Sequence, residues 1–88
     1  MGWIDEAAAA LAQEALTPEE SAVLLTTARA VAHRVERRVT PLSAFLLGCA
    51  VGTGLAADGG ATRPELLLEA ISKLEALLPA EGPSDGTG

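Results

Sequence analysis

Apolar residues recur at helical spacing in four segments of the chain. Positions three and four residues apart form one face of an α-helix. This spacing predicts helices over about residues 3–16, 18–38, 41–58 and 64–78. No segment alternates between apolar and polar residues with a period of two, so we expect no strands. The pattern therefore predicts an all-α fold, a compact four-helix bundle.

Three of these helices are preceded by a threonine and a proline. The letters TPEE, TPLS and TRPE begin at residues 17, 40 and 62. Threonine is a good N-cap, and proline fits the first turn of a helix because it lacks the N–H that would remain unpaired there. Residues 1–78 are thus predicted to form a single helical domain. The last residues, 79–88, contain too few apolar side chains to offset their ordering entropy and are predicted to be a disordered tail.

The third predicted helix is unusual because no residue from Val39 to Ala57 is charged. Its length reaches that of a membrane span, and the arginines before it resemble a positive-inside flank. However, the other three helices each have one apolar face that would lack a partner if this helix lay in lipid. A helix that is apolar on all sides is also typical of the centre of a bundle. We therefore predict a central core helix and no membrane partner.

Small residues lie in the middle of this third helix. Gly48 and Gly52 are four residues apart, a spacing that predicts a close helix crossing. Cys49 lies between them, and we expect it to be packed and inert.

Length, charge and cysteine content narrow the class of protein. A chain of 88 residues forms one domain. A net charge of −6 argues against a nucleic-acid partner, because phosphate backbones favour basic surfaces. A single cysteine allows no internal disulfide and no metal-ligand spacing. No basic signal peptide follows Met1, and these features together predict a cytoplasmic protein without a metal site.

Four of the six cationic residues lie between positions 29 and 38. At 100° per residue, Arg29, His33 and Arg37 form one stripe away from the apolar line of the second helix. Two interpretations remain open. Cations near the C-terminus of a helix complement its dipole, and exposed arginines also suit an anion or an acidic partner.

The second interpretation defines a candidate binding site. The start of the third helix would extend it with hydroxyls and free N–H groups. The candidate binding residues are Arg29, His33, Arg37, Arg38, Thr40 and Ser43. A single histidine without an acid partner or a nucleophile is not a catalytic arrangement. We therefore predict no catalytic residues and no independent enzymatic activity.

The segment ARAVAHRVERRVTPLSAFLLGCAVG, residues 28–52, resembles a small bacterial domain family of unknown function. The matching positions are Arg29, Val31-Ala32-His33, Val35-Glu36-Arg37, Pro41-Leu42 and Phe45-Leu46-Leu47-Gly48, with Trp3 as a looser match. That family occurs alone or fused C-terminal to a molybdenum cofactor guanylyltransferase. The resemblance implies a pathway, molybdopterin-guanine dinucleotide formation, rather than a chemistry.

Two functional hypotheses follow. In the first, the chain is an accessory or binding module for the biosynthesis or delivery of the molybdenum cofactor. It would dock through the basic face of the second helix onto the guanylyltransferase or a molybdoenzyme, with molybdopterin or a guanine nucleotide as a transient ligand and no covalently bound cofactor. In the second, it is a structural or oligomerising helical domain without a ligand, for example a homodimer formed through an exposed apolar edge.

Overall fold

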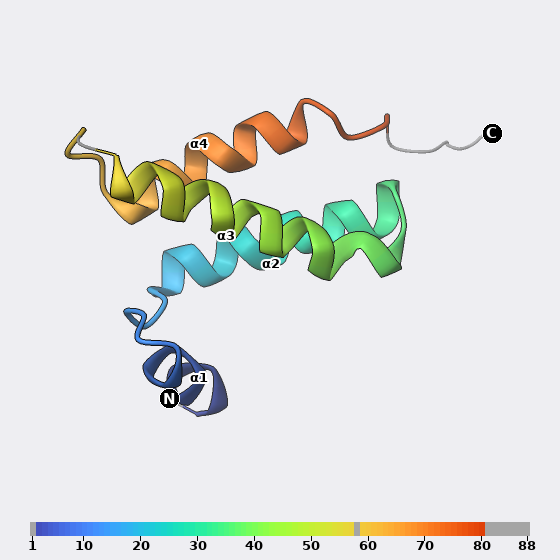
Figure 1. The fold of residues 1–88 in the computed structure, drawn as a ribbon. Helices are drawn as coiled ribbons and strands as arrows, with labels where there is room; N and C mark the ends of the chain where they lie inside the picture. Colours follow the sequence, from blue (N-terminus) through green and yellow to red (C-terminus); the bar gives the residue numbers. More distant parts are fainter. Residues whose placement is uncertain (1, 58, 81–88) are drawn as a thin grey trace.

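The computed structural model describes residues 2–57 and 59–80 (Figure 1). Within these ranges the chain forms four α-helices and no strand, which confirms the predicted all-α, four-helix fold class. The helices are α1 (Trp3–Ala10), α2 (Pro18–Arg34), α3 (Thr40–Ala56) and α4 (Arg63–Glu75), with a short 3-10 helix, η1 (Arg37–Val39), between α2 and α3. The predicted tail falls mainly on residues 81–88, which lie outside the described residues.

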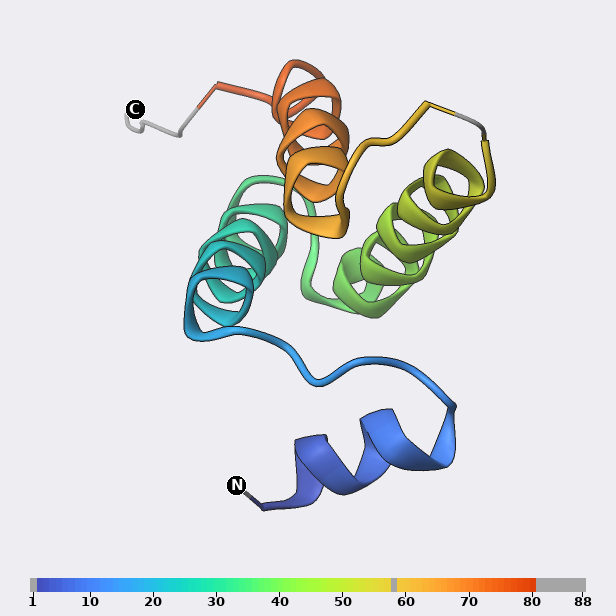
Figure 2. The ribbon, with the colours of Figure 1, turned by 90° about the vertical axis from the view of Figure 1, so that its left-hand side faces the viewer.

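The packing is uneven, because α2, α3 and α4 pack against one another and α1 lies apart (Figures 1 and 2). The core is small. Its buried members are Leu47 and Val51 from α3 and Leu67 and Ile71 from α4, and Val31 of α2 is also buried. The apolar faces predicted for the second and fourth helices therefore supply the core together with one side of α3.

Two helices begin with the predicted caps. Thr17 and Thr62 each accept a hydrogen bond from the backbone N–H three residues later, and the glutamate at that position accepts one from the threonine N–H. Both are complete capping boxes. The third start differs from the prediction, since Thr40 is itself helical and makes no cap bond. Its sequence has serine rather than glutamate three residues later, so the second half of the box cannot form.

The helices end earlier than the apolar spacing predicted. α2 stops at Arg34 rather than at residue 38, which leaves Val35 53% exposed although it continues the apolar line of the helix. α4 stops at Glu75, and α3 stops at Ala56, each two or three residues before the predicted end.

The first helix shows the largest difference. It was predicted to reach residue 16 but ends at Ala10. Ala12 adopts a φ of +58°, and the N–H groups of Ala12 and Gln13 donate to the carbonyls of Ala9 and Ala8. This is the Schellman pattern that usually places glycine in the left-handed position. The large apolar side chains here remain exposed, with Trp3 of α1 at 75% and Leu11, directly after α1, at 70%.

The burial predicted for the third helix is wrong on one side. α3 packs against both α2 and α4, but many of its apolar side chains face away from them. Cys49 is exposed rather than packed. A Cβ added at Gly48 or Gly52 would meet no atom within 4 Å, so neither glycine lies at a helix crossing. The close approach is at Gly54, where a Cβ would lie 2.7 Å from Leu66 Cδ2.

Candidate functional site

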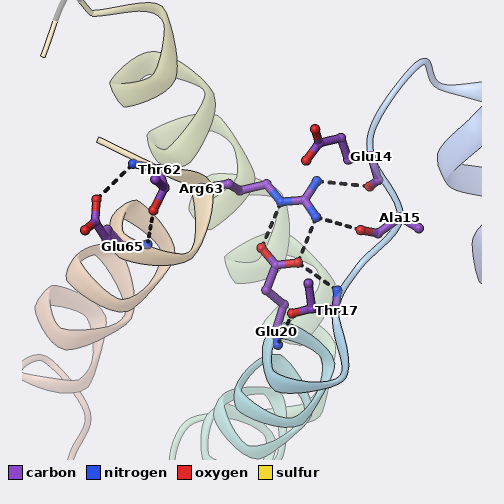
Figure 3. Close-up of polar contacts among 7 residues, drawn as sticks. All are labelled: Glu14, Ala15, Thr17, Glu20, Thr62, Arg63 and Glu65. Carbon is purple, nitrogen blue, oxygen red and sulfur yellow. Dashed lines mark hydrogen bonds and ion pairs between the residues drawn. The ribbon is translucent and has the colours of Figure 1, made fainter. Parts of the chain in front are cut away.

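A buried ion pair joins the beginnings of α2 and α4 (Figure 3). The guanidinium of Arg63 donates to both carboxylate oxygens of Glu20, from Nε at 2.8 Å and from Nη2 at 2.7 Å. It also donates to the backbone carbonyls of Glu14 (3.0 Å) and Ala15 (2.8 Å). Arg63 therefore fastens the segment before α2 to the start of α4. Sequence reasoning missed this pair, because two residues 43 positions apart leave no local signal.

Each residue of this pair stabilises the charged form of the other. Hydrogen bonding from Arg63 lowers the pKa of Glu20 below its ordinary value of 4.5, against the opposing effect of burial, and the N–H of Thr17 lowers it further. The same contact raises the pKa of Arg63. The Glu20 side chain is only 3% exposed and the Arg63 side chain 19%. With its donors engaged by protein oxygens, Arg63 has a structural role and is not a free ligand for an anion.

An apolar groove of about 320 Å³ extends from this pair along α2 and α3. Buried or half-buried side chains line part of it, namely Leu24, Leu47, Val51 and Leu67. Exposed residues of α3 line another part, namely Ala44, Gly48, Gly52 and Leu55. Gln13, Glu14 and Leu16 line it from the segment before α2. We call this feature the α2–α3 groove; its volume falls in the range of small-molecule or side-chain pockets.

The predicted basic stripe is only partly assembled. Arg29 and His33 are exposed on α2 and line a shallow depression of about 220 Å³ together with Arg34, Thr26 and Ala30. We call this feature the basic depression. Arg34, which was not among the predicted binding residues, also donates from Nε to the carbonyl of Pro79 at 3.0 Å.

The other four predicted site residues lie outside this depression. Arg37 and Arg38 belong to η1, since α2 has already ended, and Arg38 lies 3.9 Å from a carboxylate oxygen of Glu36. The hydroxyl of Ser43 donates to the carbonyl of Thr40 at 2.8 Å, and Thr40 Oγ1 is buried without a hydrogen-bond partner. Neither hydroxyl extends the basic depression.

The side of α3 that faces away from the core is apolar and exposed. Leu42 is 62% exposed, Phe45 71% and Leu46 66%. We call these three residues the outer face of α3. Together η1 and α3 form the one helical segment, Arg37–Ala56, that is long and apolar enough to cross a membrane within the described ranges, and 11% of its apolar window is buried. Sequence reasoning missed this exposed face because it assigned the whole helix to the core.

No group of three or more histidine, cysteine, aspartate or glutamate residues that could hold a metal ion occurs in the part of the chain that the structure describes. Comparison with protein families gives a match over residues 1–86 to a domain of unknown function, DUF6457. No curated protein and no solved structure matches the chain.

Proposed function

Because the chain belongs to this family of unknown function over residues 1–86, we propose its role from its surfaces: it is an accessory module that docks onto a protein of the molybdenum cofactor pathway through the outer face of α3. The observation that carries the proposal is the exposure of Leu42, Phe45 and Leu46. Contiguous exposed apolar side chains are typical of protein-interaction surfaces, and large aromatic residues often dominate their binding energy.

The pathway is supported by the resemblance of residues 28–52 to the domain that is found fused to the guanylyltransferase. Leu42, Phe45 and Leu46 are among the positions that carry this resemblance. All three are exposed, so most of their apolar surface is open to a partner. We therefore take the guanylyltransferase, or a molybdoenzyme that receives the cofactor, as the partner.

A protein partner is favoured over a lipid bilayer by the other side of the same helix. Leu47 and Val51 of α3 pack against α4 residues Leu67 and Ile71. If α3 crossed a membrane alone, these α4 side chains would lose their partners and be left in water. A partner that covers only the outer face leaves this core intact.

Substitution of Phe45 by alanine tests the proposal. We expect at least a tenfold loss of affinity for the guanylyltransferase, measured by titration calorimetry, with unchanged circular dichroism and thermal midpoint. Leu25→Ala is the matched control, because Leu25 is similarly exposed (66%) but lies on α2. Equal affinities of Phe45→Ala and the parent would contradict the docking face. Sedimentation with anionic vesicles, without binding to the enzyme, would instead assign the face to a membrane.

The basic depression supports a second candidate function, recognition of a phosphate or carboxylate group. Arginine suits such groups because its planar fork donates two hydrogen bonds at once. In this function Arg29 and His33 would contact a guanine nucleotide, a pterin phosphate or an acidic patch of the partner, and Arg37 of η1 would add charge nearby in sequence.

The double substitution Arg29→Ala, Arg37→Ala tests this second function. We expect little change in the thermal midpoint, since both residues are exposed and surface changes usually alter stability by about 0.5 kcal/mol or less. Binding of guanine nucleotides or of the guanylyltransferase should weaken at fixed salt, and replacing both residues by lysine should weaken it as well. The double substitution Arg38→Ala, Lys73→Ala is the charge-matched control, because it also removes two positive charges and neither residue lines the basic depression. Unchanged binding in the double variant would leave the arginines as partners of the helix dipole alone.

A further inference from the structure

We propose that α1 docks reversibly into the α2–α3 groove of its own chain. In the docked state it is the fourth helix of the bundle, and in the undocked state it lies apart from the other three helices. The proposal does not depend on the partner of the outer face of α3. It rests on the open groove, on the exposed apolar side chains of α1 and on the attachment of the connecting segment.

The helix α1 needs a partner. It has only 8 residues, and isolated helices this short are marginal in water even when they are rich in alanine. In the described arrangement it does not pack against α2, α3 or α4. Trp3 and Ile4 of α1 and Leu11 directly after it are at least half exposed, and their spacing places them on one side of the helix. Such a helix is stabilised mainly by packing that side against another surface.

The groove offers an open, apolar surface. Its exposed α3 edge consists of Ala44, Gly48, Gly52 and Leu55, and a Cβ at either glycine would still meet nothing within 4 Å. An incoming helix could therefore approach the backbone of α3 closely there. Four of the eight residues of α1 are alanines, so α1 is also narrow enough for a close approach. From Ala44 to Leu55, α3 rises about 16 Å, whereas α1 is about 12 Å long.

The attachment of α1 favours the groove of the same chain over that of a second copy. Arg63 holds the carbonyls of Glu14 and Ala15, and Gln13 and Glu14 already line the groove. Only residues 11–13 separate this anchor from the end of α1, a reach of roughly 10 Å. A helix tethered so closely has a high effective concentration at its own groove. Docked there, α1 would run antiparallel to α2, as neighbouring helices joined by a short connection do in bundles.

The connection contains a feature suited to a pivot. Ala12 is the one non-glycine residue with a positive φ among the described residues, a conformation that costs an L-residue energy and that persists where the surroundings hold it. Rotation about this residue breaks the hydrogen bonds that Ala12 and Gln13 donate to Ala9 and Ala8, and it redirects α1 while the Arg63 anchor and the core of α2, α3 and α4 stay in place.

The single tryptophan of the chain makes docking measurable. Trp3 is on α1, so its emission and its quenching by acrylamide report on α1 alone. For the parent protein we expect Trp3 to emit at a shorter wavelength than N-acetyl-tryptophanamide. We also expect acrylamide to quench Trp3 at least twofold less than this model compound, independently of protein concentration. Fully exposed emission of Trp3 at every concentration would overturn the proposal.

A variant that fills the groove provides the second arm. Gly48→Leu should return Trp3 to the emission and quenching of an exposed indole, because the new side chain occupies space that is open when α1 is undocked. Thr53→Leu adds a similar side chain at an exposed α3 position that does not line the groove, and it should leave Trp3 protected. Equal effects of the two variants would contradict docking in this groove.

Two further measurements keep the test decisive. If Gly48→Leu melts abnormally, the double variant Ile4→Glu, Leu11→Glu replaces it. These changes alter the apolar side of α1 and leave the core untouched, and they should likewise expose Trp3.

An energy-transfer experiment separates docking in the same chain from docking in a second copy. Trp3→Phe protein labelled at Cys49 with an energy acceptor is mixed with unlabelled parent. Energy transfer from Trp3 in this mixture would mean that α1 enters the groove of a second copy, which would overturn docking in the same chain. Energy transfer in the labelled parent, without energy transfer in the mixture, supports docking in the same chain.

Discussion

Arg63 and Glu20 show how much one pair of residues contributes to this small protein. The pair connects the beginnings of α2 and α4, and its Arg63 also donates to the carbonyls of Glu14 and Ala15 (Figure 3). Breaking a charged hydrogen bond in a buried setting is costly because the remaining group keeps its desolvation penalty. The pair therefore also fixes the segment that connects α1 to α2.

Glu20→Gln should make this contribution visible as a function of pH. The pKa of Glu20 is lower in the folded protein than the ordinary 4.5, so the unfolded chain takes up the proton first as the pH falls. Its contribution is thus complete above about pH 4.5 and is lost as the pH falls through the lowered folded value. We expect Glu20→Gln to be less stable than the parent by about 2–3 kcal/mol at pH 7, with the difference shrinking below pH 4.5.

The measurement is chemical denaturation at several pH values. Glu69→Gln is the control, because Glu69 forms only an exposed pair with Lys73 at 3.9 Å, and exposed pairs contribute little. A stability difference for Glu20→Gln that stayed constant from pH 7 to pH 3 would contradict the assigned role of the ion pair.

At the scale of elements, the helices differ in how their starts are fixed. α2 and α4 begin with complete capping boxes at Thr17 and Thr62. α3 has no side-chain cap and instead continues from η1. The starts of α2 and α4 therefore depend on hydroxyl caps, whereas the start of α3 depends on the packing of this helix between its two neighbours.

Removing the caps should destabilise the protein in a predictable way. Thr17→Ala and Thr62→Ala are each expected to lower the free energy of unfolding by about 1 kcal/mol, since an N-terminal N–H loses its acceptor. Thr53→Ala is the control in the middle of α3, where alanine is the better helix former; it should be neutral or slightly stabilising. Thermal unfolding followed by circular dichroism distinguishes these outcomes, and equal midpoints for all three variants would show that the caps are unimportant.

At the scale of the whole molecule, stability depends on very few buried side chains. A domain this short buries only a modest share of its surface, and here the described core has four clustered residues from α3 and α4. Because α2, α3 and α4 meet around them, we expect these three helices to unfold in one transition.

Ile71→Ala should test this dependence. Ile71 is 3% exposed, and truncating a buried isoleucine typically costs about 2–4 kcal/mol, a large part of the stability of a small domain. Leu68→Ala, three residues earlier on α4 and 55% exposed, should cost less than about 1 kcal/mol. Urea denaturation followed by far-UV circular dichroism gives both values; similar costs would mean that the core is not where these contacts place it.

Much of the helical architecture was determined by local sequence. The apolar face predicted for the fourth helix supplies the buried Leu67 and Ile71, and the letters TPEE and TRPE predicted threonine caps, which the structure contains within two capping boxes. Both are local effects, because helical periodicity and hydrogen bonds three residues apart depend on neighbouring positions. The same reasoning located the exposed Arg29 and His33 on α2.

What the sequence could not determine was which apolar surface finds a partner. Periodicity gives the apolar side of a helix but not its neighbour, so it could not show that α1 lies apart or that Phe45 faces outward. It also could not reveal the bond between Arg63 and Glu20, which joins residues 43 positions apart. Only the tertiary arrangement decides such contacts, because burial and ion pairing depend on the positions of all three packed helices at once.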